Sequence, residues 1–211
     1  MFSLKKVERG SGLYDYDGNE YQSLIIGSQE WLASNYRPIH YANGDPIIHA
    51  PVAADWAANT DGAWCYYNND QSYFTDLGRL YNQHAVFNPS GFVYLERNGD
   101  VEADWRVPLY ADYTALWTEL GGASIAGGKM KEIGTEYWTT PNVGATNSSR
   151  FTARGGGVRW ANGAFMEFKS VCTLWTIHHT YSVQLGYHTS SAYAFLRGYR
   201  EGLSVRLVRD I

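Results

Sequence analysis

Hydrophobic and polar positions alternate clearly near both ends of the chain. Near the start, LYDYDGNEYQSLIIGSQEWL contains two strand-like runs around Asp17-Gly18, a dipeptide typical of tight hairpin turns. Near the end, GLSVRLVRD (residues 202–210) alternates as a half-buried strand does. We therefore expect a hairpin at the start of the fold and a further strand at its end.

Two amphipathic helices are expected where apolar residues recur at positions i, i+3, i+4 and i+7. The first is capped by Thr75, and its apolar stripe is Leu77, Leu80, Tyr81 and His84. The second follows Pro108 and ends at Gly121-Gly122, and its stripe is Tyr113, Leu116, Trp117 and Leu120. Both stripes are core faces, and His84 is read as a packed histidine. After Gly121 the chain is glycine-rich, and we expect irregular structure there.

One aromatic stretch, LWTIHHTYSVQLGYH (residues 174–188), follows neither the strand period nor the helix period. It also lacks the Gly, Asn and Asp that mark ordinary loops. Two interpretations remain at this point: an unusual piece of core, or a displayed binding surface.

The length allows one large domain or two small ones, and because no internal repeat or low-complexity linker is seen, one domain is the simplest organisation. The chain has 211 residues, of which 16% are aromatic and only 18% charged, so wide Tyr-rich surfaces are expected. We expect residues 1–12 to be a leader and residues 13–211 to be one domain. MFSLKKVERG contains no apolar run of signal-peptide length, and no stretch is long and apolar enough to span a membrane.

Charge and motifs exclude several classes of function. Residues 1–150 carry 10 basic and 18 acidic side chains, a net charge of −8, whereas residues 151–211 carry 7 and 3, a net charge of +4. A nucleic-acid-binding protein would have a denser basic patch. No HExxH, GxSxG, Walker or Rossmann pattern occurs, so we expect no enzyme activity and no cofactor. Adjacent His178 and His179 would point to opposite faces of a strand, so we expect no metal site there either.

Seven segments occur in an order that resembles one protein family: YDYDGNEYQSLIIGSQEWLASN, GAWCYYNND, LGRLYNQHAV, WRVPLYADYTALWTELGG, AGGKMKE, GATNSSRFTARGGGVRWANGAF and GLSVRLVRD. Together they resemble the Fibrobacter succinogenes major paralogous domain, from about Leu13 to Ile211. The resemblance implies an α+β, C-type-lectin-like fold with two helices, short and mostly antiparallel strands, and long irregular loops.

The resemblance also implies a function. Related C-type-lectin-like domains are variable proteins of diversity-generating retroelements, among them phage receptor-binding proteins, whose adenine-templated codons are rewritten near the C-terminus. Residues 170–200 contain no Asp, Glu, Lys, Asn, Met or Pro. Only Trp175 and Gln184 lie outside the set of residues encoded by codons ending in a pyrimidine, the set that mutated Asn codons reach. A Tyr- and Ser-rich strand region under ordinary drift is the alternative origin of this composition.

Departures from the family pattern bear on where the protein works. The cysteine that secreted members carry before the second helix is absent, and Leu207 stands where they carry another. Synthesis in the bacterial cytoplasm and assembly into a virion, as part of a phage tail, are therefore expected, with the bacterial cell surface as the alternative. A capping Asp near the start of the second helix is replaced by Tyr110, at a cost of about 1 kcal/mol.

The predicted function is non-enzymatic ligand recognition by a receptor-binding or adhesin domain, with a variable region at about residues 171–200. Trp175 and Leu185 are expected to be packing positions. A bacterial surface protein or glycan is the expected partner, with a trimer in a fibre as a possible assembly. The candidate ligand-binding residues are Ile177, His178, His179, Tyr181, Val183, Tyr187, His188, Tyr193, Phe195, Arg197, Tyr199 and Arg200.

Two alternative functions differ in class. One is a cell-surface paralogous domain with a structural or glycan-binding role. The other is a formylglycine-generating-type enzyme, which shares the fold class but uses two active-site cysteines close together in sequence. Cys172 has no such neighbour, because the second cysteine of the chain is Cys65.

Overall fold

A computed structural model describes residues 12–177 and 181–211. In these residues the fold mixes helices and sheets, as expected. The helices are α1 (Ala53–Ala58), α2 (Phe74–Leu77), α3 (Gln83–Val86), α4 (Tyr110–Glu119) and α5 (Ala123–Met130), with 3-10 turns η1 (Tyr67–Asn69) and η2 (Gln71–Tyr73).

The strands form five small sheets, and all but one of the strand pairs within them are antiparallel. The first, in the order β2-β1-β8-β9, contains β1 (Leu13–Tyr14), β2 (Glu20–Tyr21), β8 (Glu96–Arg97) and β9 (Asp100–Val101). The second, in the order β15-β4-β3, contains β3 (Ser23–Ile26), β4 (Gln29–Leu32) and β15 (Val208–Asp210). The third contains β5 (Ile48–His49), β6 (Ala63–Cys65) and β7 (Leu80–Tyr81). The others are β10 (Val158–Arg159) with β11 (Phe165–Met166), and β12 (Val171–Trp175), β13 (Tyr181–Gly186) and β14 (Ala192–Leu196).

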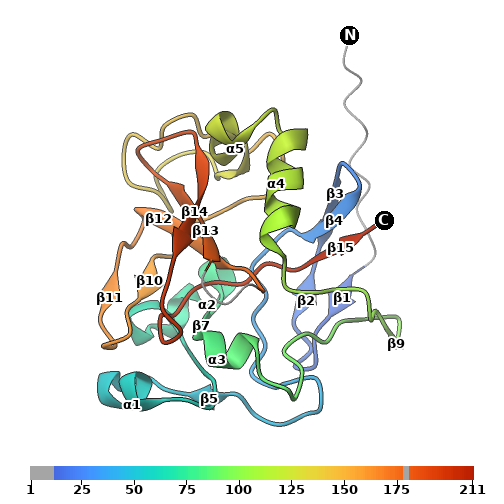
Figure 1. The fold of residues 1–211 in the computed structure, drawn as a ribbon, viewed down its shortest axis with the longest axis vertical. Coiled ribbons are helices and arrows are strands. Elements are labelled where there is room, and N and C mark those ends of the chain that lie inside the picture. The colour runs from blue at the N-terminus through green and yellow to red at the C-terminus, as the bar shows by residue number, and fades with distance from the viewer. Residues whose placement is uncertain (1–11, 178–180) are drawn as a thin grey trace.

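Helices α4 and α5 lie together at one end of the molecule, and α4 lies between the β12–β13–β14 sheet and the β15–β4–β3 sheet (Figure 1). The ring of Tyr113 on α4 contacts Trp31 on β4 at 5.1 Å between centroids. A core cluster under these helices includes Leu116, Trp138 and Leu185. A second, larger cluster includes Tyr81, Trp105 and Trp175 and lies on the opposite face of strand β12.

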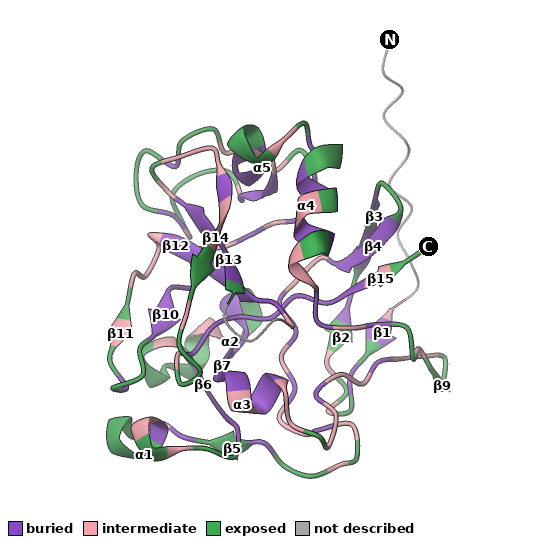
Figure 2. Cartoon of the chain, viewed as in Figure 1, coloured by how far each residue is buried: buried purple, intermediate pink, exposed green. Residues whose placement is uncertain are grey.

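The β12–β13 pair is buried on both of its faces, which explains its irregular sequence. Val171 and Trp175 on β12 reach the larger cluster, whereas Cys172 and Leu174 reach the cluster under the helices. All five residues of β12, and every residue of β13 except Tyr181, are buried (Figure 2). A strand covered on both faces can carry apolar residues at successive positions, as β12 does, whereas in β13 Val183 and Leu185 alternate with the buried polar residues Ser182 and Gln184. Much of the aromatic stretch is therefore core.

The initial hairpin and the second predicted helix are confirmed. Leu13 pairs with Tyr21 across the Asp17-Gly18 turn, in which Gly18 has a φ of 75°. Helix α4 buries its predicted apolar stripe and ends before Gly121. The lost cap at Tyr110 is compensated two residues later. There the Asp112 carboxylate accepts a hydrogen bond of 2.6 Å from the backbone N–H of Leu109.

The prediction of a single helix after Thr75, with an apolar stripe from Leu77 to His84, is wrong. Instead, α2 ends at Leu77, Leu80 and Tyr81 form strand β7 against β6, and α3 begins after Asn82. Gly78, at φ 75° and ψ −138°, ends the first helix because only glycine adopts this conformation without strain. Asn82 then caps α3 by accepting from the N–H of Ala85. The helical spacing arose from three short elements that each face the core.

In the glycine-rich segment after Gly121, residues 131–157 are irregular apart from isolated bridges, as expected, but its start is the helix α5, contrary to our expectation. Its glycines serve close packing: a Cβ on Gly127 would lie 2.4 Å from the Ser191 carbonyl oxygen, and one on Gly128 would lie 2.3 Å from that of Gly144. The terminal strand is also shorter than predicted. Residues 202–204 make single bridges to three different segments, and only β15 forms a regular pair, with β4.

Gly127→Ala should therefore destabilise the protein although alanine favours helix formation. The new methyl group would collide with backbone, and overpacking of this kind costs about 1–3 kcal/mol. Urea unfolding of the variant measures the loss. Ser124→Ala, at an exposed position of the same helix, is the control and should change the free energy of unfolding by less than about 0.5 kcal/mol. Equal stability of the two variants would contradict the close packing of α5.

Candidate ligand-binding surface

The β13–β14 hairpin displays large apolar side chains at its open end. Tyr181 pairs with Leu196, and their side chains are 45% and 64% exposed. Phe195, opposite Ser182, is 44% exposed, and Tyr199 in the following loop is 52% exposed. We call the group Tyr181, Phe195, Leu196, Tyr199 and Arg200 the hairpin surface. Isolated exposed apolar residues are normal, but a group on one element marks an interaction site.

The hairpin surface is held by ordered structure beneath it. The Tyr181 ring stacks on Tyr110 of α4 at 5.9 Å between centroids and 25° between planes. The Ser182 hydroxyl donates to the Phe195 carbonyl oxygen at 3.0 Å. Because successive residues of a strand point to opposite faces, Leu196 lies on the face of Tyr181 and Phe195 on the other face. The surface therefore wraps the edge of the sheet.

Val183 does not belong to this surface. It was predicted to contact a ligand, but its side chain is 0% exposed and packs in the cluster under α4 and α5. The prediction failed because Val183 lies on the helix-covered face of a strand that is buried on both sides. Trp175 and Leu185, predicted as packing positions, are both 0% exposed.

Three other candidates are only half buried. Ile177 packs against the larger cluster, and its N–H donates to the Pro108 carbonyl oxygen at 2.8 Å. Tyr187 packs against the cluster under the helices, and its N–H donates to the Ser170 carbonyl oxygen at 3.0 Å. Burial and the nearby Glu167 raise the pKa of Tyr193. These side chains support the hairpin as well as bordering it.

His188 is exposed at the turn between β13 and β14, with its ring 5.4 Å from that of Tyr187. This turn is the opposite end of the hairpin from Tyr181 and Leu196, so His188 is exposed but lies apart from the hairpin surface. His178 and His179, the other two histidines of the predicted surface, lie outside the described residues.

Arg197 is a structural residue in this arrangement. Its side chain is 7% exposed and forms ion pairs with Glu167 at 3.0 Å and Glu201 at 3.3 Å. The guanidinium carbon also lies 4.7 Å from the centre of the Phe195 ring. Arg197 thus fixes the end of β14 and the ring of Phe195, and a ligand would meet the ring before the charge.

The loop after β14 presents Tyr199 and Arg200 on a fixed backbone. The Tyr199 carbonyl oxygen accepts from the N–H of Gln83 at 2.9 Å, and that of Arg200 accepts from Trp56 Nε1 at 2.7 Å. Both side chains remain exposed. Pre-organised side chains lose little conformational entropy on binding.

The turn between β13 and β14 is anchored from below by a buried ammonium group. Lys131 Nζ donates to the carbonyl oxygens of Gly186, Thr189 and Val143 at 2.8, 2.8 and 2.9 Å. The residue is 0% exposed, and burial lowers the pKa of its ammonium group to about 8. The turn that carries Tyr187 and His188 is therefore tied to the residue after α5.

This buried ammonium predicts a pH dependence of stability. The folded-state pKa of Lys131 is about 8 against 10.5 as the reference, so the unfolded chain binds more protons between these values. Raising the pH through this window should stabilise the wild type relative to Lys131→Met, whereas the difference should be constant below about pH 7. Urea unfolding of both proteins from pH 7 to pH 10 measures it. A difference that does not change with pH would contradict the lowered pKa.

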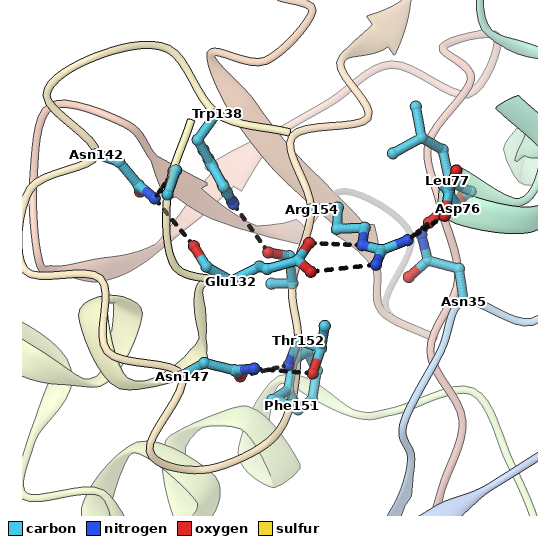
Figure 3. A network of polar contacts seen from close by, with 12 residues as sticks. Asn35, Asp76, Leu77, Glu132, Trp138, Asn142, Asn147, Phe151, Thr152 and Arg154 are labelled. Atoms are coloured by element: carbon cyan, nitrogen blue, oxygen red, sulfur yellow. Dashed lines mark hydrogen bonds and ion pairs between the residues drawn. The ribbon is translucent and has the colours of Figure 1, made fainter. Parts of the chain in front are cut away.

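A network of polar contacts joins the long loops (Figure 3). Arg154 binds Glu132 through Nε at 2.6 Å and Asp76 through one terminal nitrogen at 2.6 Å. Asn35 Nδ2 donates to the Leu77 carbonyl oxygen at 2.9 Å. Arg154 and Asp76 also line a hollow of about 160 Å³. Because these charges already pair with each other, we read the network as a clamp between loops.

The two cysteines are separate and buried in different clusters. Burial raises the pKa of the Cys65 thiol to about 12 and that of Cys172 to about 11, the opposite of an activated nucleophile. In the described part of the chain, no three His, Cys, Asp or Glu side chains are placed to hold a metal ion. Nor do those residues include a helix long and apolar enough to cross a membrane.

Two contributors to this surface were missed by sequence reasoning. Leu196 is the most exposed large apolar side chain of the hairpin, and Tyr110 supplies the stacking partner of Tyr181. The alternation Ala192, Ala194, Leu196 would have placed Leu196 on the same face of the strand as the two alanines. No signal in the sequence connects Tyr110 with Tyr181, since their contact depends on how α4 packs.

A family model described as Fibrobacter succinogenes major domain matches residues 24–209. The match runs from β3 into β15 and includes the whole hairpin. The resemblance expected from the ordered motifs is thereby confirmed. Comparison with curated proteins and with solved structures gives no match.

Proposed function

Because the chain belongs to the Fibrobacter succinogenes major domain family, and because its β13–β14 hairpin exposes a group of large apolar side chains, we propose that it is a non-enzymatic recognition domain. The hairpin surface is its binding surface. The observation that carries this proposal is the exposure of Tyr181, Phe195, Leu196 and Tyr199 on a hairpin whose other residues are largely buried. Aromatic side chains give large contact area at low entropic cost.

The finer proposal is a C-type-lectin-like receptor-binding domain of a phage tail, diversified by a retroelement. Its partner would be a bacterial surface protein or glycan, and a trimer in a fibre would add avidity. The amino-acid composition of residues 170–200 supports it. Trp175 and Gln184, the two residues outside the pyrimidine-ending set, are both buried, and Gln184 Nε2 donates to the Thr173 hydroxyl at 3.2 Å. Framework residues of this kind would be excluded from diversification.

Sequencing of alleles and of the neighbouring DNA tests the genetic part. We expect substitutions in alleles to concentrate at exposed positions between 171 and 200, with Trp175, Val183 and Leu185 unchanged. A near-copy of the 3′ coding segment beside a reverse transcriptase gene should accompany them. Substitutions spread evenly over the chain, without such a copy, would leave the alternative of an ordinary cell-surface paralogous domain.

Binding to bacterial cells tests the recognition surface directly. Fluorescently labelled protein should bind host cells, and serine at all four apolar positions of the hairpin surface should abolish binding. The matched control replaces four equally exposed apolar residues elsewhere: Val52, Val101, Ile125 and Ile133. Binding that is lost only in the control variant would contradict the proposed surface.

A further inference from the structure

A groove continues from the hairpin surface onto α3. One hollow of about 380 Å³ is lined by Tyr199, Arg200 and their neighbours Gly198 and Ala161. A second, of about 310 Å³, is lined by Asp61, Phe87, Asn88 and Pro89. Both are also lined by Thr60 and His84, so the two hollows meet at these side chains. Volumes of this size fall within the ~300–1,000 Å³ of small-molecule sites.

Four polar side chains of this groove are unused, whereas that of Asn88 donates to the Asp61 carbonyl oxygen at 3.2 Å and accepts from the N–H of Ser90 at 2.9 Å. In residues 12–177 and 181–211, the side chains of Thr60, Asp61, His84 and Arg200 form no hydrogen bond and no ion pair with another described residue. They supply both donors and acceptors: a hydroxyl, a carboxylate, an imidazole and a guanidinium. The Arg154 clamp, by contrast, has its charges paired. The unused hydrogen-bond donors and acceptors of this groove are therefore available to a ligand.

The groove also has an aromatic wall. The Tyr199 ring lies 6.4 Å from the His84 ring, with 30° between their planes, and is 52% exposed. Its backbone is fixed by the N–H of Gln83, the residue before His84. The wall and α3 therefore form one rigid unit.

We propose that this groove binds a pyranose ring of a neutral glycan, with one face of the sugar on Tyr199 and its hydroxyls on Asp61, Thr60, His84 and Arg200. This inference rests on the proposed recognition function and names the ligand class of part of its surface. A sugar has an apolar face of C–H groups and hydroxyls that both donate and accept, which matches a mostly apolar site with a few convergent polar groups. One carboxylate and one guanidinium line the groove, so it favours a ligand without net charge.

Saturation-transfer NMR on the full chain tests the proposal. The probes are the methyl glycosides of glucose, galactose, mannose and N-acetylglucosamine. We expect saturation transfer to the ring C–H protons of at least one glycoside. Tyr199→Ala should weaken binding at least about tenfold, the loss typical of a hot-spot aromatic. Asp61→Asn, which keeps the shape of the side chain, should weaken it as well.

Tyr14→Ala is the matched control, because Tyr14 is an exposed tyrosine outside the groove and outside the hairpin surface. It should bind the glycoside as the wild type does. Circular dichroism melts show whether the variants are folded. If Tyr199→Ala does not fold, Asp61→Asn alone tests the groove. Absence of transfer from all four glycosides, or equal transfer in wild type, Tyr199→Ala and Asp61→Asn, would overturn the proposal. If labelled protein still binds host cells through the hairpin surface, only the glycan groove is refuted and the recognition function stands.

Discussion

Trp175→Ala is expected to lower the free energy of unfolding by about 3–5 kcal/mol, the range for removing a buried tryptophan. The Trp175 side chain is 0% exposed in the larger cluster, and its Nε1 donates to the Tyr81 carbonyl oxygen at 2.7 Å. The ring thus joins β12 to β7, while the backbone N–H of Trp175 donates separately to the Ser204 carbonyl oxygen at 3.0 Å. Urea unfolding measures the loss.

The contrasting variant carries serine at four exposed hairpin positions: Tyr181, Phe195, Leu196 and Tyr199. Exposed side chains without structural partners change stability by less than about 0.5 kcal/mol each. Tyr181 should lie at the upper end, because its ring stacks on Tyr110. We therefore expect Trp175→Ala to lose more stability than the four-serine variant, and the four-serine variant to lose more cell binding than Trp175→Ala. If the surface variant unfolds while Trp175→Ala does not, the hairpin surface belongs to the core.

Arg206→Met is expected to cost about 3–5 kcal/mol, because it leaves several buried acceptors without this donor. Arg206 is 2% exposed and has no carboxylate partner among the described ion pairs. Its guanidinium donates to the carbonyl oxygens of Leu32 and Phe151 at 2.9 and 2.8 Å, and to Asn35 Oδ1 at 3.1 Å. Burial lowers the pKa of this guanidinium to about 10, so the group remains charged at neutral pH.

Arg200→Met makes the same chemical change at an exposed position and is the control. Its free energy of unfolding should stay within about 0.5 kcal/mol of the wild type. Thermal and urea unfolding of the two variants should therefore separate clearly. If Arg206→Met lowers the free energy of unfolding as little as Arg200→Met does, the buried guanidinium contributes little to stability.

Local signals predicted those parts of the fold in which neighbours in sequence determine the structure. The Asp17-Gly18 hairpin and α4 depend on a turn dipeptide, an apolar stripe and terminal glycines, all legible in the sequence. The failures have tertiary causes. Gly78 is a single residue that ends a helix, and Leu80 and Tyr81 become a strand because β6 offers them a partner. Gly127 and Gly128 remain helical because neighbouring backbone approaches them closely.

The candidate surface was predicted in its location but not in its exact residues. Tyr181, Phe195 and Tyr199 are exposed as expected, whereas Val183 is buried and Arg197 is held by two carboxylates. The packing of α4 and α5 covers the face of β13 that carries Val183, and this packing cannot be read from the sequence of the strand. The groove at His84 could not be foreseen either, because it joins segments separated by more than 100 residues.

The carbonyl anchoring of Lys131 has a consequence for how the surface can change over generations. Its acceptors at Gly186 and Thr189 flank Tyr187 and His188, and they are main-chain oxygens. Every amino acid supplies such an oxygen, so replacement of the side chains between them leaves the anchor intact. Arg206 and Arg159 hold their loops in the same manner. A scaffold built this way has high mutational robustness, because the side chains at this turn can be replaced without compensating changes in its supports.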